Sequence, residues 1–188
     1  NKGILGYHEE MLVLFLEADE YVYKEKNYKS YCNGVKGVIS ICGYESCFGY
    51  VVSEDQVEDH NFALNAIGKP SENITDIEIE ANKNTVTQIA NTLRDTGWKF
   101  ATSTYGNIDA SSATMEEIQS DFDKWLTQIG SLLGPTHMIV YPNGNYIKGT
   151  DERAEYLKAL GFRIFFGIGP NPYYTYGLNY LYYDRTLI

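Results

Sequence analysis

The chain has 188 residues, of which 44% are hydrophobic and 21% charged, and its net charge is -10 at pH 7. This size and composition are typical of a globular domain with a sizeable core, so we expect residues 1–188 to form a single domain. The acidic balance argues against nucleic-acid binding, which needs a basic face. No run of about eighteen apolar residues occurs, so no membrane span is expected. The N-terminus also lacks the pattern of a secretory signal peptide.

Helical and strand periodicities alternate along the chain. Residues 9–28 have helical spacing, with an apolar stripe of Leu12, Phe15, Leu16 and Val22. Further helices are predicted at 79–96, 115–132 and, capped by Thr150, at 151–160. Short apolar runs predict strands at 35–42, 98–104, 137–141, 163–168 and 178–183. Residues 43–68 are rich in Gly and acids and predict an irregular loop or lid, and residues 51–77 are interpreted as an insertion.

Alternation of strands and helices joined by short turns predicts a parallel sheet. The strands are apolar on both faces, which favours a (β/α) barrel-like fold over an open doubly wound sheet. Five predicted strands are too few for a closed eight-stranded barrel, so we expect an incomplete or distorted barrel. Its exposed strand edges predict a homo-oligomer or strand exchange. No Gly-rich phosphate loop follows a strand, which excludes the usual nucleotide-binding arrangement.

Two motifs resemble those of the NodB-type polysaccharide deacetylase family. Residues 97–107 read GWKFATSTYGN and residues 141–144 read YPNG, whereas the family patterns look like GWEFASHTYGH and YPYG. The segment 31–50 is also similar to a family pattern of the type YxGAKGTIALTGYEGILGY. The resemblance covers most of the chain and implies a barrel of the family's type, carbohydrate metabolism and an extracellular or cell-surface location.

The family's histidines hold a divalent metal such as zinc, and their places are taken here by Ser103 and Asn107. Hydroxyl and amide groups are neutral, weak donors and do not replace two imidazoles, so no metal or other cofactor is expected. Family members also carry an Asp-Asp pair at the end of their first strand. The nearest acidic cluster is 17–20, within a helical pattern, so the chain is interpreted as beginning after that strand.

Several polar and aromatic residues follow predicted strands and should therefore meet on one rim of the sheet. Tyrosine can stack on a sugar ring, and Tyr, Ser and Asn can hydrogen-bond sugar hydroxyls. The candidate ligand-binding residues are Tyr44, Glu45, Ser103, Tyr105, Asn107, Tyr141, Asn143 and Asp184. For Asn143 a plain turn at Asn-Gly is the alternative interpretation. The chain has 17 tyrosines, and most are expected to pack in the interior, with residues 173–183 the stretch that stands out.

Three functions are compatible with these features. The first is a polysaccharide deacetylase-like protein, impaired or inactive as an enzyme, that binds glycans. The second is an active hydrolase of carbon-nitrogen amide bonds in carbohydrate or peptidoglycan, whose Asp-Asp strand is supplied from outside this chain. The third is a protein-interaction module that uses its acidic loop and Tyr-rich C-terminal region. A fold alone does not decide among them, because function resides in the site.

Overall fold

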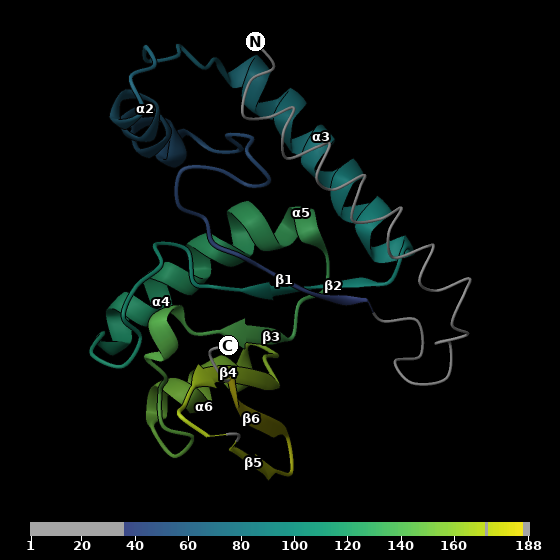
Figure 1. Cartoon of the computed structure of the whole chain (residues 1–188), viewed down its shortest axis with the longest axis vertical. Coiled ribbons are helices and arrows are strands. Elements are labelled where there is room, and N and C mark those ends of the chain that lie inside the picture. The colour runs from purple at the N-terminus through teal and green to yellow at the C-terminus, as the bar shows by residue number, and fades with distance from the viewer. Residues whose placement is uncertain (1–35, 172, 186–188) are drawn as a thin grey trace.

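The computed structural model describes residues 36–171 and 173–185, which form an α/β fold around one six-stranded sheet (Figure 1). The strand order is β1-β2-β3-β4-β6-β5, and all neighbours are parallel except the antiparallel pair β5 and β6. The strands are β1 (Gly37–Ile41), β2 (Trp98–Thr102), β3 (Met138–Val140), β4 (Ile164–Ile168), β5 (Tyr174–Gly177) and β6 (Tyr180–Arg185). The helix predicted at 9–28 lies outside the described residues.

Helices connect β1 to β2, β2 to β3 and β3 to β4, as the alternating pattern predicts, whereas β4 leads to its parallel neighbour β6 through β5. The helices are η2 (Glu54–Gln56), α2 (Val57–Ala66), α3 (Asp76–Asp95), α4 (Met115–Lys124), η3 (Trp125–Gly130), α5 (Ser131–Leu133), η4 (Pro142–Gly144) and α6 (Glu152–Ala159). The capping box predicted at Thr114 is present, with Glu117 as its partner. The predicted cap at Thr150 is wrong by one residue, because Asp151 occupies the cap and accepts from the Arg153 amide.

The region predicted to be irregular, 43–68, contains η2 and α2, so the loop prediction is wrong for residues 54–66. Buried Gln56 fixes the start of this helix: its Nε2 donates to the Gly43 carbonyl at 2.7 Å and its Oε1 accepts from the Val52 amide at 2.7 Å. No residue of α2 is buried, and Phe62 is 69% exposed. A helix without an apolar stripe leaves no periodic signal in the sequence.

The helix predicted at 115–132 is not uniform, because η3 is a π-helical segment within it. Its wider turn shifts the apolar stripe by one residue at the end. Leu133 is therefore the buried residue of the last turn, whereas the predicted Leu132 is half-buried. The Trp125 indole in this segment donates to the Ile41 carbonyl at 2.8 Å and ties the helix to β1.

One face of the sheet is packed against the helices. Residues opposite one another in a sheet point to the same side, and one register row runs through Ile41, Thr102, Ile139, Phe165 and Tyr182. Every member of this row is at most 9% exposed. Two core clusters cover it, one built with α3, η3 and α5 and the other with α4 and α6.

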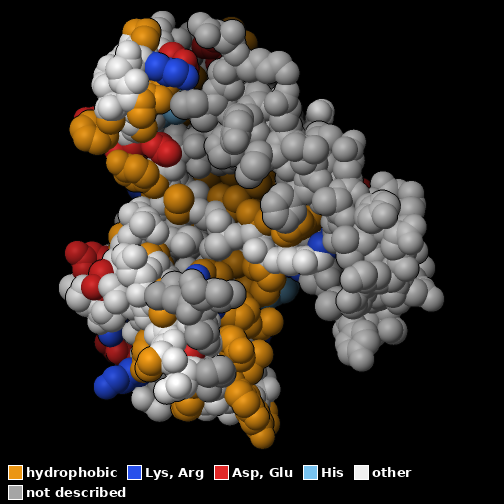
Figure 2. All heavy atoms as spheres, viewed as in Figure 1, with side chains coloured by type: hydrophobic (Ala, Val, Ile, Leu, Met, Phe, Trp, Pro, Cys, Tyr) orange, Lys and Arg blue, Asp and Glu red, His pale blue; other side chains and the backbone are white. Residues whose placement is uncertain are grey.

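The opposite face of the sheet, which we call the open face, is apolar yet largely uncovered in the described part of the chain. Its members alternate with the buried row along each strand. They are Val38, Ser40, Lys99, Ala101, Met138, Val140, Ile164, Phe166, Ile168, Leu181, Tyr183, Arg185, Tyr174 and Tyr176, of which Lys99 and Arg185 carry a charge. A band of hydrophobic side chains is visible over β4, β6 and β5 (Figure 2).

The sheet is open between its edge strands β1 and β5, since no pairing joins them within residues 36–171 and 173–185. Strand β5, which forms a hairpin with β6, was not predicted and is an exception to the expected parallel arrangement. None of the helices in these ranges is both long and apolar enough to cross a membrane.

Candidate functional site

The loop after β2 carries three of the predicted site residues, Ser103, Tyr105 and Asn107, and a buried carboxylate holds it in place. Asp121 on α4 accepts from the Tyr105 amide at 2.7 Å and from the Gly106 amide at 2.8 Å. Burial raises the pKa of Asp121, and the two backbone donors oppose this rise. The loop is therefore a fixed turn anchored on the adjacent helix.

Ser103 and Asn107 do not present ligands of the kind that zinc needs. The Ser103 hydroxyl donates to the Val140 carbonyl at 3.2 Å, which joins the ends of β2 and β3. Asn107 is exposed and has a left-handed backbone, with φ of 53°. Both side chains are neutral, so the pair does not fit a divalent metal. Outside residues 1–35, 172 and 186–188, no three His, Cys, Asp or Glu side chains are grouped for metal binding.

Two predicted rim tyrosines, Tyr105 and Tyr141, are instead part of the core. Tyr105 is 9% exposed, and its ring packs on Gly43, where a Cβ would lie 2.1 Å from the ring. Tyr141 is fully buried and stacks on Phe165 with a centroid separation of 6.4 Å. Burial raises the pKa of both phenols. Tyr141 continues the alternation of Ile139, so its side chain enters the helix-covered side of the sheet.

The remaining predicted residues are spread over two other loops and β6. Tyr44 is 39% exposed, and Glu45 after β1 has a φ of 51°. Asn143 is exposed in η4 with a φ of 53°, which confirms the turn interpretation of the Asn-Gly pair. Asp184 accepts from the Tyr182 hydroxyl at 2.5 Å.

The carboxyl ends of the strands are joined by hydrogen bonds, so the loops after β1, β2 and β3 do lie together. The Gly43 amide donates to the Tyr105 carbonyl at 2.8 Å. Arg185, which sequence reasoning missed, extends this edge: it donates from Nε to the Gly167 carbonyl and from Nη2 to the Tyr141 carbonyl, both at 3.0 Å. Burial lowers the pKa of this guanidinium, which remains a cation at neutral pH.

A second site, absent from the predicted residues, is a cavity of about 220 Å³ between the β5–β6 hairpin and the start of α6. Its wall contains four tyrosines, Tyr146, Tyr173, Tyr180 and Tyr182. The aromatic Phe165 and the aliphatic Ile147 lie beside them. We call this cavity the tyrosine pocket.

Packing within the tyrosine pocket fixes its rings. Tyr146 and Tyr173 lie against Tyr182, with centroid separations of 4.8 and 6.3 Å. Lys158 sits over the Tyr180 ring at 4.3 Å, and its Nζ donates to the Gly149 carbonyl at 2.8 Å. Such a site offers ring faces for stacking together with phenol and ammonium groups for hydrogen bonds.

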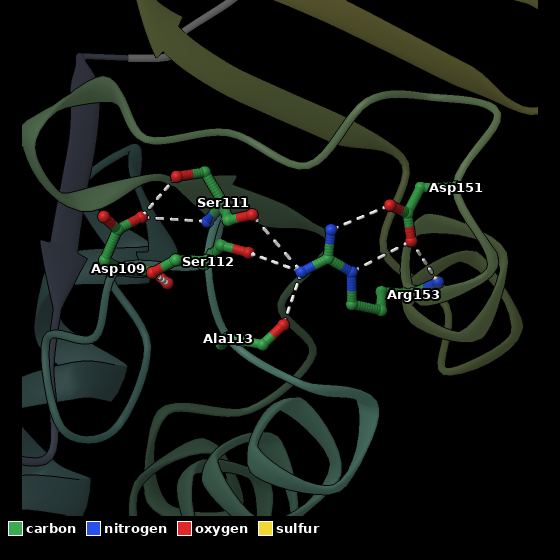
Figure 3. Close-up of polar contacts among 7 residues, drawn as sticks. Asp109, Ser111, Ser112, Ala113, Asp151 and Arg153 are labelled. Atoms are coloured by element: carbon green, nitrogen blue, oxygen red, sulfur yellow. Dashed lines mark hydrogen bonds and ion pairs between the residues drawn. The ribbon is translucent and has the colours of Figure 1, made fainter.

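A shallower hollow of about 490 Å³ lies beside the loop after β2, lined in part by Tyr105, Asp109, Glu117 and Lys124. The Arg153 guanidinium links its wall to the pocket-forming helix α6 (Figure 3). Nη1 of Arg153 donates to the carbonyls of residues 110, 111 and 113, while Nε and Nη2 bind the Asp151 carboxylate at 2.9 and 2.7 Å. This arginine therefore ties residues 110–113, two of which line the hollow, to the start of α6.

Comparison with known proteins adds no assignment to this geometry. No protein-family model matches the chain, and a search of curated proteins found no relative.

The tyrosine pocket had one sequence signal, the density of tyrosines in 173–183. That signal could not distinguish the two sides of the hairpin. Tyr180 and Tyr182 point toward the pocket, whereas Tyr174, Tyr176 and Tyr183 belong to the open face. The contribution of Tyr146 and Lys158 depends on the hairpin folding back over α6, which no local pattern indicates.

Proposed function

We propose that this protein is a NodB-type deacetylase-like domain that binds glycans without metal-dependent deacetylation, and that a sugar ring enters the tyrosine pocket. The observation that carries this proposal is the wall of four tyrosines around a cavity of about 220 Å³. Sites for drug-sized ligands measure about 300–1,000 Å³, so this pocket suits a single ring of a longer chain.

The architecture supports the scaffold part of the proposal. From β1 to β4 and then β6, each parallel strand lies next to the previous one, as in (β/α) barrels, whereas doubly wound sheets reverse their order. A sheet with helices packed on one face and apolar side chains on the other is also what a partial barrel would have. On this basis we propose an incomplete barrel of the deacetylase type, in a protein of the cell surface or the extracellular space.

The chemistry of the candidate residues supports binding over hydrolysis. Amide hydrolysis at neutral pH needs an activated water and a polarised carbonyl, which the deacetylase family supplies with a metal and a carboxylate base. At the end of β2 the described residues offer only neutral Ser103 and Asn107. Of the carboxylates beside this loop, Asp121 accepts from two backbone amides, Asp109 accepts from Ser111, and Glu117 accepts from the Thr114 amide.

Calorimetric titration of the full chain with chitotetraose tests the proposal. We expect Tyr173→Ala and Tyr180→Ala each to weaken binding two- to tenfold, from about 0.5–1.5 kcal/mol per lost aromatic contact. Tyr174→Ala is the matched control, because this exposed tyrosine belongs to the same hairpin but faces away from the pocket. Binding that responds equally to all three changes would place the sugar elsewhere. An absence of heat with chitotetraose and with cellotetraose would refute glycan binding at this pocket.

A further inference from the structure

The open face has the composition of a buried surface. Two apolar register rows cross it, one through Met138, Ile164, Leu181 and Tyr176 and the other through Val140, Phe166, Tyr183 and Tyr174. A third row pairs Ile168 with Arg185 at the carboxyl ends of the strands. The face includes no Asp or Glu, although the chain has 25 of them. Sheets with parallel strands are normally covered on both sides, so a face of this kind is expected to have an occupant.

Exposure on this face is substantial where the strands reach the hairpin. Tyr174 and Tyr176 are 63% and 74% exposed, and Tyr183 and Leu181 are 39% and 37% exposed. At the other edge of the sheet, Val38 is 42% exposed. The aromatic rings are ordered against one another, since Phe166 meets Tyr183 edge-on at 6.4 Å and Tyr174 stacks on Tyr176 at 6.5 Å.

We propose that this face is the docking surface for the chain's own N-terminal segment, through the apolar run Met11–Leu16. This run, Met-Leu-Val-Leu-Phe-Leu, is six consecutive apolar residues in the 35 that precede the described structure. Such a run exposed to water in an otherwise acidic chain is unfavourable. Its burial against the open face removes two apolar surfaces from water at once.

The connection between the run and the sheet has a suitable length. Twenty residues, 17–36, separate Leu16 from the start of β1. With residues 17–28 in the predicted helix at 1.5 Å per residue and residues 29–36 extended at up to 3.3 Å each, the connection can reach up to about 44 Å. Six strands about 4.8 Å apart span about 24 Å, so the run can reach any part of the face.

The same tether favours intramolecular docking over pairing of two copies. A segment that belongs to the same chain has a high effective concentration at the face whenever its connection can span the distance. A second copy at micromolar concentration competes poorly with it, and the charge of -10 on each chain adds repulsion.

Limited digestion of the full chain with chymotrypsin, followed by mass spectrometry, tests this inference at Phe15 and its neighbours. We expect the run to be protected in the wild type and Tyr183→Glu to accelerate its cleavage by on the order of tenfold or more. Tyr176→Glu, at a more exposed position of the same face, should do the same. Leu178→Glu is the control, because this fully exposed residue lies in the turn between β5 and β6.

Circular dichroism and light scattering complete the test. Each variant must keep the wild-type spectrum, which separates release of the segment from unfolding. Wild-type cleavage at Phe15 as fast as in Tyr183→Glu would overturn the proposal. A wild-type dimer that Tyr183→Glu converts to monomers would also overturn it, since a second copy would then cover the face. The titration with chitotetraose is independent of both outcomes, because the tyrosine pocket lies on the other side of the hairpin.

Discussion

The buried carboxylate of Asp121 should determine the stability of the loop that holds Ser103, Tyr105 and Asn107. It accepts two backbone hydrogen bonds, at 2.7 and 2.8 Å, and the residue is 8% exposed. Removing one partner of a buried hydrogen bond leaves the other unsatisfied at a cost of about 1–3 kcal/mol, and Asp121→Ala would leave the amides of Tyr105 and Gly106 without this acceptor. We therefore expect Asp121→Ala to lower the free energy of unfolding by about 3 kcal/mol.

Asparagine retains one acceptor at this position, so Asp121→Asn should lower the free energy of unfolding by about half as much. Urea denaturation followed by circular dichroism measures both changes. The control is Asp123→Ala on the same helix, whose exposed side chain should change stability by less than about 0.5 kcal/mol. If Asp121→Ala unfolds with the wild-type midpoint, or if Asn destabilises more than Ala, the two-acceptor account is wrong.

The pKa of Asp121 gives this prediction a pH dependence of known sign. Burial raises its pKa above the ordinary 3.8, so the folded state holds the carboxyl proton more tightly than the unfolded state. The resulting contribution to stability is complete below pH 3.8 and is lost as pH rises through the folded-state pKa. The stability difference between wild type and Asp121→Asn should therefore be larger in acid than at neutral pH.

Three further predictions concern packing, ion pairing and metal content. Gly43→Ala should lower the free energy of unfolding by about 1–3 kcal/mol, because the new Cβ would lie 2.1 Å from the Tyr105 ring. Gly149→Ala is the control and should be tolerated, because its Cβ would meet only atoms at 3.5 Å or more. Hydrogen bonds and charge from Arg153 lower the pKa of Asp151 to about 2. The contribution of this carboxylate to stability is therefore present above the ordinary pKa of 3.8 and is lost as pH falls through about 2. The stability of Asp151→Asn, measured as a function of pH in acid, should lack this loss. Elemental analysis of the purified chain should find no stoichiometric zinc, and one tightly bound equivalent would contradict our account of the neutral pair after β2.

Much of the scaffold could be predicted because its signals are local. Capping at Thr114 and the apolar runs of β1 to β4 follow from the residues themselves. Helix α2 could not be predicted, since its anchor Gln56 bonds to groups 4 and 13 residues away and its helix buries nothing. Strand β5 was missed because its stability depends on pairing with β6.

The candidate site was harder to predict than the fold, and the reason is alternation along the strands. Ser103 and Tyr141 each follow a parallel strand, and both therefore lie at the same edge of the sheet, as expected. The side on which each points depends on register, and Tyr141 falls on the helix-covered side, where it is fully buried. The tyrosine pocket is made by Tyr146, α6 and the β5–β6 hairpin, which are brought together only by the folded chain.

The position of the two tryptophans affects how unfolding of this protein can be observed. Trp98 and Trp125 both pack in the core cluster formed with α3, η3 and α5, and the chain has no others. The cluster beneath the tyrosine pocket contains none. Intrinsic tryptophan fluorescence therefore records the melting of the first cluster, while near-ultraviolet circular dichroism of the tyrosines records both, since Tyr105 packs in the first cluster and Tyr141 and Tyr182 in the second. A difference between the two midpoints would reveal that the clusters come apart separately.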